Sequence, residues 1–351
     1  MRIITCVEDL RRLHKKRAPK AFYDYVDCGS YTEDTYRANS ADLAALKLRQ
    51  RVAIDTEGRS TESTMLGRKV TMPIALAPVG LTGMQWADGE ILAARAAEKF
   101  GVPFTLSTMS ICSIEDVAER TTEPFWFQLY VMRDRDFIKR LIGRAKAAKC
   151  SALVLTLDLQ VIGQRHKDLK NGMTVPPKIT LSNVFDLLTK PGWALRMLGA
   201  KRKLFGNIVG HVKGAEGIVS LSKWTASQFD PTLDWRDVDW VKNEWGGKLI
   251  LKGIQDVEDA KMAVSAGADA IVVSNHGGRQ LDGAISSIKA LALGAKGTLI
   301  GRAFNLGLGA MGEAGVTAAL QIIRNELDTT MALCGVRTIG EIGRNLVLNP
   351  Y

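Results

Sequence analysis

Short apolar runs alternate with helix-like segments over most of this chain of 351 residues. The runs are rich in β-branched residues, and strands of that kind alternating with helices are typical of a parallel sheet covered on its outside. Because the unit recurs so often in one order, a closed barrel explains the pattern better than an open sheet. The strand-like runs are residues 70–79, 102–108, 125–131, 152–159, 248–254, 270–276 and 297–302.

The segments between these runs carry the apolar spacing of helices, and two of them close with Gly, a common helix stop. We predict helices at 89–101, 113–120, 136–149, 234–245 and 257–268. The whole chain, 1–351, is interpreted as one domain. Within it we expect an N-terminal helical part at 1–65, the barrel at 66–345 and a long inserted loop after the fourth strand at 159–232.

The predicted fold class is α/β, a TIM (β/α)8-type barrel, yet only seven of the eight expected strands can be identified. Residues 278–296, GRQLDGAISSIKALALGAK, read as one loop and one helix. These 19 residues are too few for a helix, a strand and a second helix. One unit of the barrel is therefore missing from the pattern at this place.

Charge and cysteine content narrow the class of protein. There are 47 Lys and Arg against 37 Asp and Glu, and the net charge of +10 permits an anionic partner. The five cysteines include no CxxC pair, so we predict neither a disulfide framework nor a metal site. We expect no membrane span and no signal peptide, because no run reaches about 18 apolar residues and the first residues lack the signal pattern.

Polar side chains gather where the predicted strands end. Each alone also fits a snorkelling Lys or a satisfied core His, but their coincidence at one pole favours an active site, since barrels carry their chemistry at the carboxyl ends of the strands. The set comprises Gln128 and Tyr130 in the third run, Thr156 and Asp158 at the end of the fourth, Lys252 in the fifth and His276 in the sixth.

Several motifs together carry a family resemblance. SNHGGRQLDG (274–283) and LTLDLQVIGQR (155–165) are the most specific, and FYDYVDCGSYTEDTYRAN (22–39), PIALAPVG (73–80) and GTLIGRAF (297–304) extend the match nearly end to end. The chain resembles the FMN-dependent α-hydroxy acid oxidase/dehydrogenase family. The resemblance implies FMN as the cofactor and an L-2-hydroxy acid as the substrate.

The resemblance also implies residue roles at the substrate. His276 is similar to the family's active-site base, and an imidazole suits proton transfer near neutral pH. Asp158 is similar to its carboxylate partner. Arg165 and Arg279 resemble a pair that clamps the substrate carboxylate, while Tyr25 and Tyr130 resemble phenols that hydrogen-bond the substrate. From the residues alone, a solvated loop for Arg165 and a half-buried helix position for Tyr25 remain open.

Other residues resemble those that hold the flavin. Lys252 is similar to the cation beside the pyrimidine edge of the ring. Val79 replaces the Thr of many relatives, and Gly80, where oxidases commonly have Ala, favours a dehydrogenase. The remaining counterparts are Ser107, Gln128 and Thr156 at the ring, Pro78, Val79 and Gly80 as backbone at its reactive edge, and Gly301 and Arg302 at the phosphate.

The chain departs from the family where one barrel unit is missing. Relatives have a strand ending in DGGxRxG between SNHGGRQLDG and the LGAKGTLIGR region, and that segment of roughly 30 residues is absent here. Its Asp, glycines and Arg hold the FMN ribityl chain and phosphate in the family. A catalytically impaired or inactive enzyme, or a non-catalytic binding protein, is therefore an alternative to an active dehydrogenase.

A basic and apolar segment follows the fourth strand. Residues 187–215 contain no Asp or Glu, six Lys or Arg, and interspersed Trp, Phe, Leu, Met and Ile. Such a segment suits the interface of an anionic membrane, and it resembles the insertion of membrane-associated bacterial members. The alternative is a helix packed over the barrel mouth as a lid.

These features lead to one functional prediction. We expect oxidation of L-lactate to pyruvate with FMN, electrons passing to a quinone, on a protein bound peripherally to the cytoplasmic side of the inner membrane. An oxidase or a mandelate-type dehydrogenase is the nearest alternative, because Met109 stands where some relatives carry an aromatic residue near the substrate. We expect no nucleic-acid binding, since no stacking platform or recognition motif is present. By analogy with the family, a homotetramer is expected.

Overall fold

The computed structural model describes residues 3–288 and 294–348. All seven predicted strand regions contain a strand, and the seven are parallel to one another. Their bounds are β3 (Ile74–Leu76), β4 (Thr105–Ser107), β5 (Trp126–Leu129), β6 (Ala152–Thr156), β7 (Leu249–Ile254), β8 (Ala270–Val273) and β9 (Thr298–Ile300).

The strands follow one another in space as they do in the sequence. One sheet has the order β4-β5-β6-β7-β8, and a second pairs β3 with β9. A parallel bridge between Leu76 and Phe104 joins β3 to β4, which gives the order β9-β3-β4-β5-β6-β7-β8. Between the described residues of β8 and β9 there is no ladder. In the described part of the chain, the interruption of the sheet thus coincides with the place where the sequence lacks one unit.

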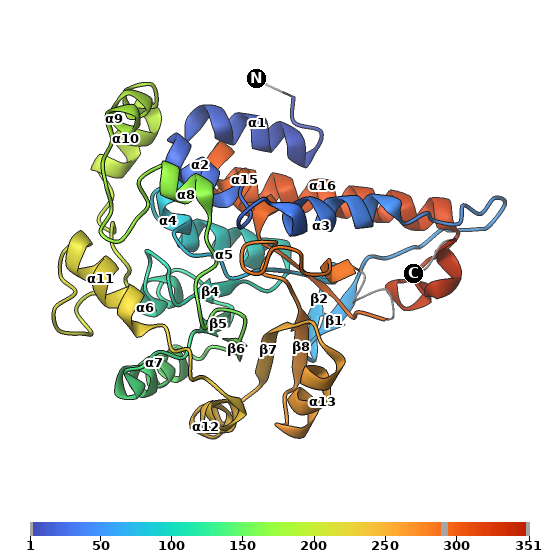
Figure 1. Ribbon diagram of the computed structural model, residues 1–351. Coiled ribbons are helices and arrows are strands. Elements are labelled where there is room, and N and C mark those ends of the chain that lie inside the picture. The colour runs from blue at the N-terminus through green and yellow to red at the C-terminus, as the bar shows by residue number, and fades with distance from the viewer. Residues whose placement is uncertain (1–2, 289–293, 349–351) are drawn as a thin grey trace.

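The five predicted helices are confirmed, and they cover the outside of the strands (Figure 1). Ser113 caps α6 and Asp234 caps α12 with side-chain hydrogen bonds, and Gly101 closes α5 and Gly246 closes α12 in the left-handed conformation. Their bounds are α5 (Gly89–Phe100), α6 (Ile114–Ala118), α7 (Arg135–Ala147), α12 (Trp235–Trp245) and α13 (Val257–Ser265).

Helices from the two ends of the chain lie together above the strands (Figure 1). Leu10 and Leu13 of one pack against Ala310, Ala319 and Ile322 of two others in a shared apolar cluster. This contact places the N-terminal segment at the carboxyl ends of the strands. The helices concerned are α1 (Val7–Arg17), α2 (Lys20–Val26), α3 (Asp34–Ala45), the short α4 (Thr82–Gln85), α15 (Arg302–Met311) and α16 (Glu313–Cys334).

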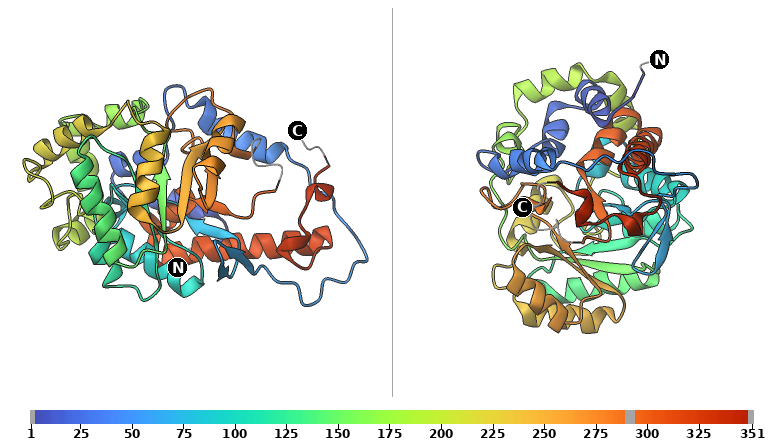
Figure 2. Two further views of the ribbon diagram at one scale, coloured as in Figure 1. Left: turned by 90° about the horizontal axis from the view of Figure 1, so that it is seen from below. Right: turned by 90° about the vertical axis from the view of Figure 1, so that its right-hand side faces the viewer.

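The first predicted strand is too long, and the structure divides it. Val70 ends β2 (Arg68–Val70), which pairs antiparallel with β1 (Ser63–Met65), and β3 begins only at Ile74. Pro73 lies between them and has no amide hydrogen to donate to a ladder, which accounts for the interruption. The β1–β2 hairpin, light blue in Figure 2, has its turn at the amino end of β7, where Lys248 Nζ donates to Leu66 O over 2.6 Å.

The insertion after β6 contains four short helices joined by irregular segments. It holds α8 (His166–Lys170), α9 (Leu181–Leu188), α10 (Pro191–Leu198) and α11 (Ile218–Gln228). Figure 1 shows α9 and α10 at the periphery of the molecule, beside α1 and α2. The helix expected within 278–296 falls mainly on 289–293, outside the described residues. After α16 the chain forms two 3-10 turns, Ile339–Glu341 and Arg344–Leu346.

Candidate active site

A row of polar side chains crosses four neighbouring strands at their carboxyl ends. The register places Ser107 opposite Gln128, and Thr156 opposite Lys252. The Ser107 hydroxyl donates to Gln128 Oε1 over 3.2 Å, and Gln128 Nε2 donates to Thr156 Oγ1 over 3.0 Å. All four residues are buried. The hydrogen bonds fix the orientation of the Gln128 amide, so the row is rigid before any ligand binds.

Asp158 and His276 form the pair that the sequence predicted. Nδ1 of His276 lies 2.8 Å from Asp158 Oδ1, although the two residues follow different strands, β6 and β8. His276 has a φ of +57°, and its amide donates to Ser274 Oγ over 3.0 Å. A non-glycine residue in the left-handed region is strained, and the tight turn after β8 holds it there.

Gly253 makes room for this pair. It has a φ of +106°, and a Cβ at this position would lie 2.7 Å from Asp158 Cβ. Any larger residue would therefore push Asp158 away from His276. Sequence reasoning did not single out Gly253, although it stands next to Lys252 in the fifth predicted strand.

The charges around the pair set its protonation. Burial by itself would raise the pKa of Asp158, but the positive charge of Lys252 and the contact with His276 outweigh it and lower this pKa to about 2. Burial lowers the pKa of His276, and Lys252 lowers it further against the opposing effect of Asp158. The arrangement therefore provides a carboxylate beside a neutral imidazole, which is the form that accepts a proton.

Two guanidinium groups converge on one aromatic ring. Arg279 lies 4.7 Å and Arg165 lies 5.9 Å from the centre of the Tyr25 ring. Arg165 is held by a 3.0 Å ion pair with Asp168 on α8, and Arg279 Nη1 donates to Cys28 Sγ over 3.0 Å. A carboxylate bound here would meet two planar cations, which suit bidentate hydrogen bonds. Asp168 was not predicted, although its spacing of three residues from Arg165 pointed to it.

Tyr130 adds a neutral hydrogen-bond donor near these groups. Burial, followed by the negative charge of Asp158, raises the pKa of its phenol well above the usual range. The phenol therefore keeps its proton at physiological pH. Its ring packs edge-on against Phe229, with centroids 6.1 Å apart.

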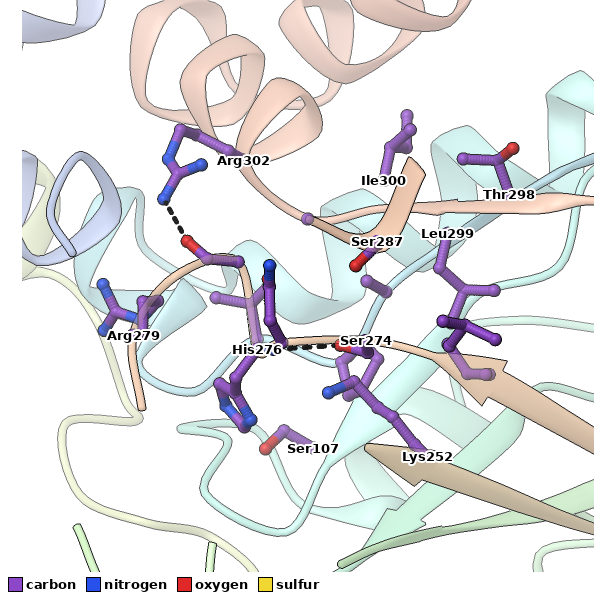
Figure 3. Close-up of a pocket in the computed structure, with 18 of the residues that line it drawn as sticks. Ser107, Lys252, Ser274, His276, Arg279, Ser287, Thr298, Leu299, Ile300 and Arg302 are labelled. Carbon is purple, nitrogen blue, oxygen red and sulfur yellow. Dashed lines mark hydrogen bonds between the residues drawn. The ribbon is translucent and has the colours of Figure 1, made fainter. Parts of the chain in front are cut away.

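A cavity of about 1630 Å³ connects these groups. Twelve of the fifteen predicted site residues line it, and the other three, Asp158, Gln128 and Thr156, lie directly behind the lining. Figure 3 shows Ser107, Lys252, His276 and Arg279 around this space, which continues toward β9. The sequence thus named residues that the fold brings into one place.

The ring end of the cavity fits a flavin. Lys252 Nζ is buried and has no hydrogen-bond partner, and it lies 3.7 Å from Asp158 Oδ2. An unsatisfied buried ammonium is costly unless a ligand accepts its hydrogen bonds. Pro78, Val79 and Gly80 line the same cavity opposite this strand end. These residues would hold the ring of FMN, with Lys252 next to its electron-poor edge.

The phosphate end is less complete. Gly301 caps α15, whose first amide groups are free to bind an anion. The Arg302 guanidinium, however, already donates to backbone carbonyls: Nε lies 3.0 Å from Val26 O, and Nη2 lies 3.3 Å from Cys28 O. Its guanidinium also stacks on Tyr36 at 4.5 Å. Much of the hydrogen-bonding capacity expected for a phosphate is already used within the protein.

Gln280 is a further residue that sequence reasoning missed. Its side-chain amide donates to the carbonyls of Asp158 and Val161, each over 2.8 Å, and its Oε1 accepts from Gly163 N over 3.1 Å. It therefore fastens the loop after β6 to the loop after β8. Among the described residues there is no cluster of three or more metal-binding side chains.

The barrel and the convergence of an imidazole–carboxylate pair, two guanidiniums and a buried lysine define a flavin-dependent oxidoreductase. The family described as FMN-dependent dehydrogenase matches residues 14–291 and 288–349. This chain belongs to that family, whose cofactor is FMN.

Individual relatives agree with this assignment. An L-lactate dehydrogenase of Caulobacter sp. (strain K31) is 43% identical over 98% of both chains, and one of Vibrio parahaemolyticus is 43% identical with the same coverage. A crystal structure of the monotopic membrane protein (S)-mandelate dehydrogenase superposes with a TM-score of 0.94 at 33% identity, covering 99% of this chain and 100% of the other.

The comparison also locates the missing unit. The alignment to the Caulobacter relative spans 376 positions, whereas 98% of these 351 residues is about 344. About 32 aligned positions therefore have no counterpart here. The two stretches matched by the family meet at residues 288–291, between β8 and β9. The absent segment thus corresponds to the place where the sheet is open.

Proposed function

We propose that this protein oxidises an L-2-hydroxy acid, with L-lactate as substrate and pyruvate as product. The observation that carries the proposal is the Asp158–His276 pair, whose imidazole lines the same cavity as Arg165 and Arg279. A 2-hydroxy acid has a carboxylate for the guanidiniums and an adjacent hydroxyl and α-hydrogen for the imidazole. The names of the relatives at 43% identity favour lactate.

His276 acts as the base through Nε2, because Nδ1 is engaged by Asp158. It accepts either the hydroxyl proton or the α-proton of the substrate. Asp158 holds the tautomer and stabilises the imidazolium that forms. FMN, when bound, accepts the two electrons that leave the α-carbon. Tyr130 donates to the oxygen on that carbon, while Arg165 and Arg279 prevent the substrate from turning.

Mandelate is the second candidate substrate, and the structural relatives support it. Met109 lines the cavity close to Gly80, where a Cβ would lie 3.2 Å from Met109 Cβ. A flexible thioether adapts to both a methyl group and a phenyl ring. Comparison of kcat/KM for L-lactate and (S)-mandelate separates the two candidates.

We further propose that the protein binds the membrane surface through α9 and α10 and passes its electrons to a quinone there. Part of the predicted segment 187–215 is buried, since Trp193 and Met197 pack against Ala18 and Phe22. The exposed apolar side chains of the two helices are Leu181, Val184, Phe185, Leu187, Leu188, Leu195 and Leu198.

Three further observations bear on the membrane proposal. Lys190, Lys201 and Lys203 lie among or next to the exposed apolar residues and suit anionic headgroups. No described helix is long and apolar enough to cross a membrane. The structural relative described as monotopic supports surface binding.

The proposed location is the cytoplasmic side of the inner membrane. A homotetramer is proposed from the family resemblance, and light scattering tests it.

The absorption spectrum of the purified protein, before and after anaerobic L-lactate, tests the proposed activity. Flavin bands that bleach with lactate are expected, followed by reoxidation with a quinone faster than with oxygen. A colourless protein that takes up no added FMN contradicts the proposal and favours a non-catalytic family member. The missing unit and the internally bonded Arg302 are the observations that would then account for the loss.

A further inference from the structure

The geometry points to a strand-accepting slot between β8 and β9, in which an extended polypeptide segment supplied in trans binds as the missing parallel strand. The segment it fits has the chemistry of the unit that relatives carry at this place. The inference rests on the fold and not on the proposed activity, so the two can fail separately.

The first observation is that, among residues 3–288 and 294–348, each flanking strand is paired on one side alone. β8 pairs with β7, and β9 pairs with β3. Thr298 N donates to Pro73 O, and Ile300 O accepts from Ala77 N, so both residues bond toward β3. Alternate residues of a parallel strand bond to opposite neighbours, so the amide and carbonyl of Leu299 point to the other edge. Unpaired edges of this kind are templates for another strand.

The second observation is that apolar side chains of the two strands are uncovered. Ile271 of β8 is 38% exposed, whereas Leu251, its partner in β7, is 0% exposed. Leu299 and Ile300 of β9 are also less buried than the inner strands. Both strands line the large cavity, as do Ile323 and Leu327 of α16. The slot therefore has apolar side chains on the barrel side and on the helix side, where Glu326 and Thr330 of α16 lie beside them.

The third observation identifies the occupant. In relatives more than 40% identical over the full chain, about 32 further residues stand between the positions of β8 and β9. That length suffices for one strand and one helix of a barrel. In relatives, the residues that cover this slot thus belong to a known segment. Without that segment, this chain has an opening at the same place, and the opening fits one strand.

Strand direction and side-chain pattern follow from the neighbours. Because β8 and β9 run parallel to the rest of the sheet, the added strand runs in the same direction. Its side chains alternate between the cavity and the outer face near α16, and both environments are apolar, so a continuous apolar run fits best. Backbone hydrogen bonds to both edges supply affinity, as in other cases of strand addition.

The test uses the full-length protein and a synthetic peptide. The probe is a fluorescein-labelled peptide comprising the residues of the Caulobacter relative that align with the gap. We expect a saturable rise in fluorescence anisotropy and slowed hydrogen exchange of the Leu299 amide. The same peptide, N-methylated at alternate strand residues, cannot donate to one edge. Loss of about three backbone hydrogen bonds weakens binding by about 100-fold.

Matched protein variants provide the second control. Ile271→Lys places a charge in the slot, and we expect it to weaken peptide binding at least tenfold. Val264→Lys places the same charge on an exposed apolar position of α13, outside the cavity, and leaves binding unchanged. Circular dichroism shows whether both variants keep the fold.

Three results would overturn the inference. The first is the absence of saturable binding by the folded wild-type chain. The second is equal binding of the methylated and unmethylated peptides. The third is a dimer of the chain that excludes the peptide and that Ile271→Lys dissociates, because a second copy would then occupy the slot. Sedimentation velocity of the free chain detects that dimer.

Discussion

The Nδ1 atom of His276 lies 2.8 Å from Oδ1 of Asp158, while Oδ2 of the same carboxylate lies 3.7 Å from Nζ of Lys252. One carboxylate therefore stands between the imidazole and the buried ammonium. Lys252 and Asp158 act on the pKa of His276 in opposite directions. Replacing Lys252 should therefore raise the pKa of His276, and replacing Asp158 should lower it.

Asp158→Asn should move the acid limb of kcat/KM to lower pH. The neutral imidazole is the active form, and its pKa in the wild type lies below the ordinary 6.5. Loss of the carboxylate removes an effect that raises this pKa, so the limb shifts down. The rate should also fall on the order of 100-fold or more, because the imidazolium loses its partner. Stopped-flow flavin reduction across pH measures both effects, and Asp256→Asn is the exposed control.

Lys252→Met should move the same acid limb to higher pH, because the repulsion that lowers the pKa of His276 disappears. FMN should also bind about tenfold to 100-fold more weakly, since one charge-assisted hydrogen bond is lost. Fluorescence quenching of added FMN measures the affinity. Lys261→Met, on the exposed face of α13, serves as the control. If the acid limb of kcat/KM moves to lower pH in Lys252→Met, Lys252 does not lower the pKa of His276 as described.

Gly253→Ala should destabilise the protein by roughly 2 kcal/mol or more, because a Cβ at φ +106° meets Asp158 Cβ at 2.7 Å. Gly143→Ala is the matched control at an exposed position of α7, where no atom lies within 4 Å of the added Cβ. That change should stabilise the helix by about 0.5–1 kcal/mol. Urea unfolding at pH 7 distinguishes the two outcomes. Equal midpoints for both variants would show that the loop relaxes without cost.

Binding to anionic liposomes should be lost when Phe185, Leu188 and Leu198 are all changed to Ser, because these are three of the seven exposed apolar side chains of α9 and α10. The double change Val257→Ser and Val264→Ser on α13 removes exposed apolar surface elsewhere and should leave co-sedimentation unchanged. Replacing all of 190–210 would be a poorer test, since Arg202 in this stretch bonds both Asp88 and Asp116. If the triple variant co-sediments with liposomes as well as the wild type does, α9 and α10 are not the membrane-binding surface.

The sequence alone predicted the seven strand regions and twelve of the residues that line the cavity, because local patterns and motifs indicate both. Continuous apolar runs end at Thr156 and Ile254, and the polar residues that follow or interrupt them fall at one pole by the geometry of parallel strands. The motif around His276 carried the chemistry through resemblance. The missing unit was also visible from spacing, since 19 residues cannot hold three elements.

Other features depended on contacts between distant segments. Gly253 leaves space for Asp158, and the carbonyls of Val26 and Cys28 accept hydrogen bonds from Arg302. Trp193 and Met197 of the basic segment are buried against Ala18. All three features follow from packing between residues more than 90 positions apart in the sequence. Periodicity reports which face of an element is apolar but not which partner covers it. The sequence therefore determined the barrel-type α/β fold and the position of its gap. Only the tertiary structure shows that β8 and β9 form no ladder among the described residues, because strand closure depends on the free energy of the whole sheet.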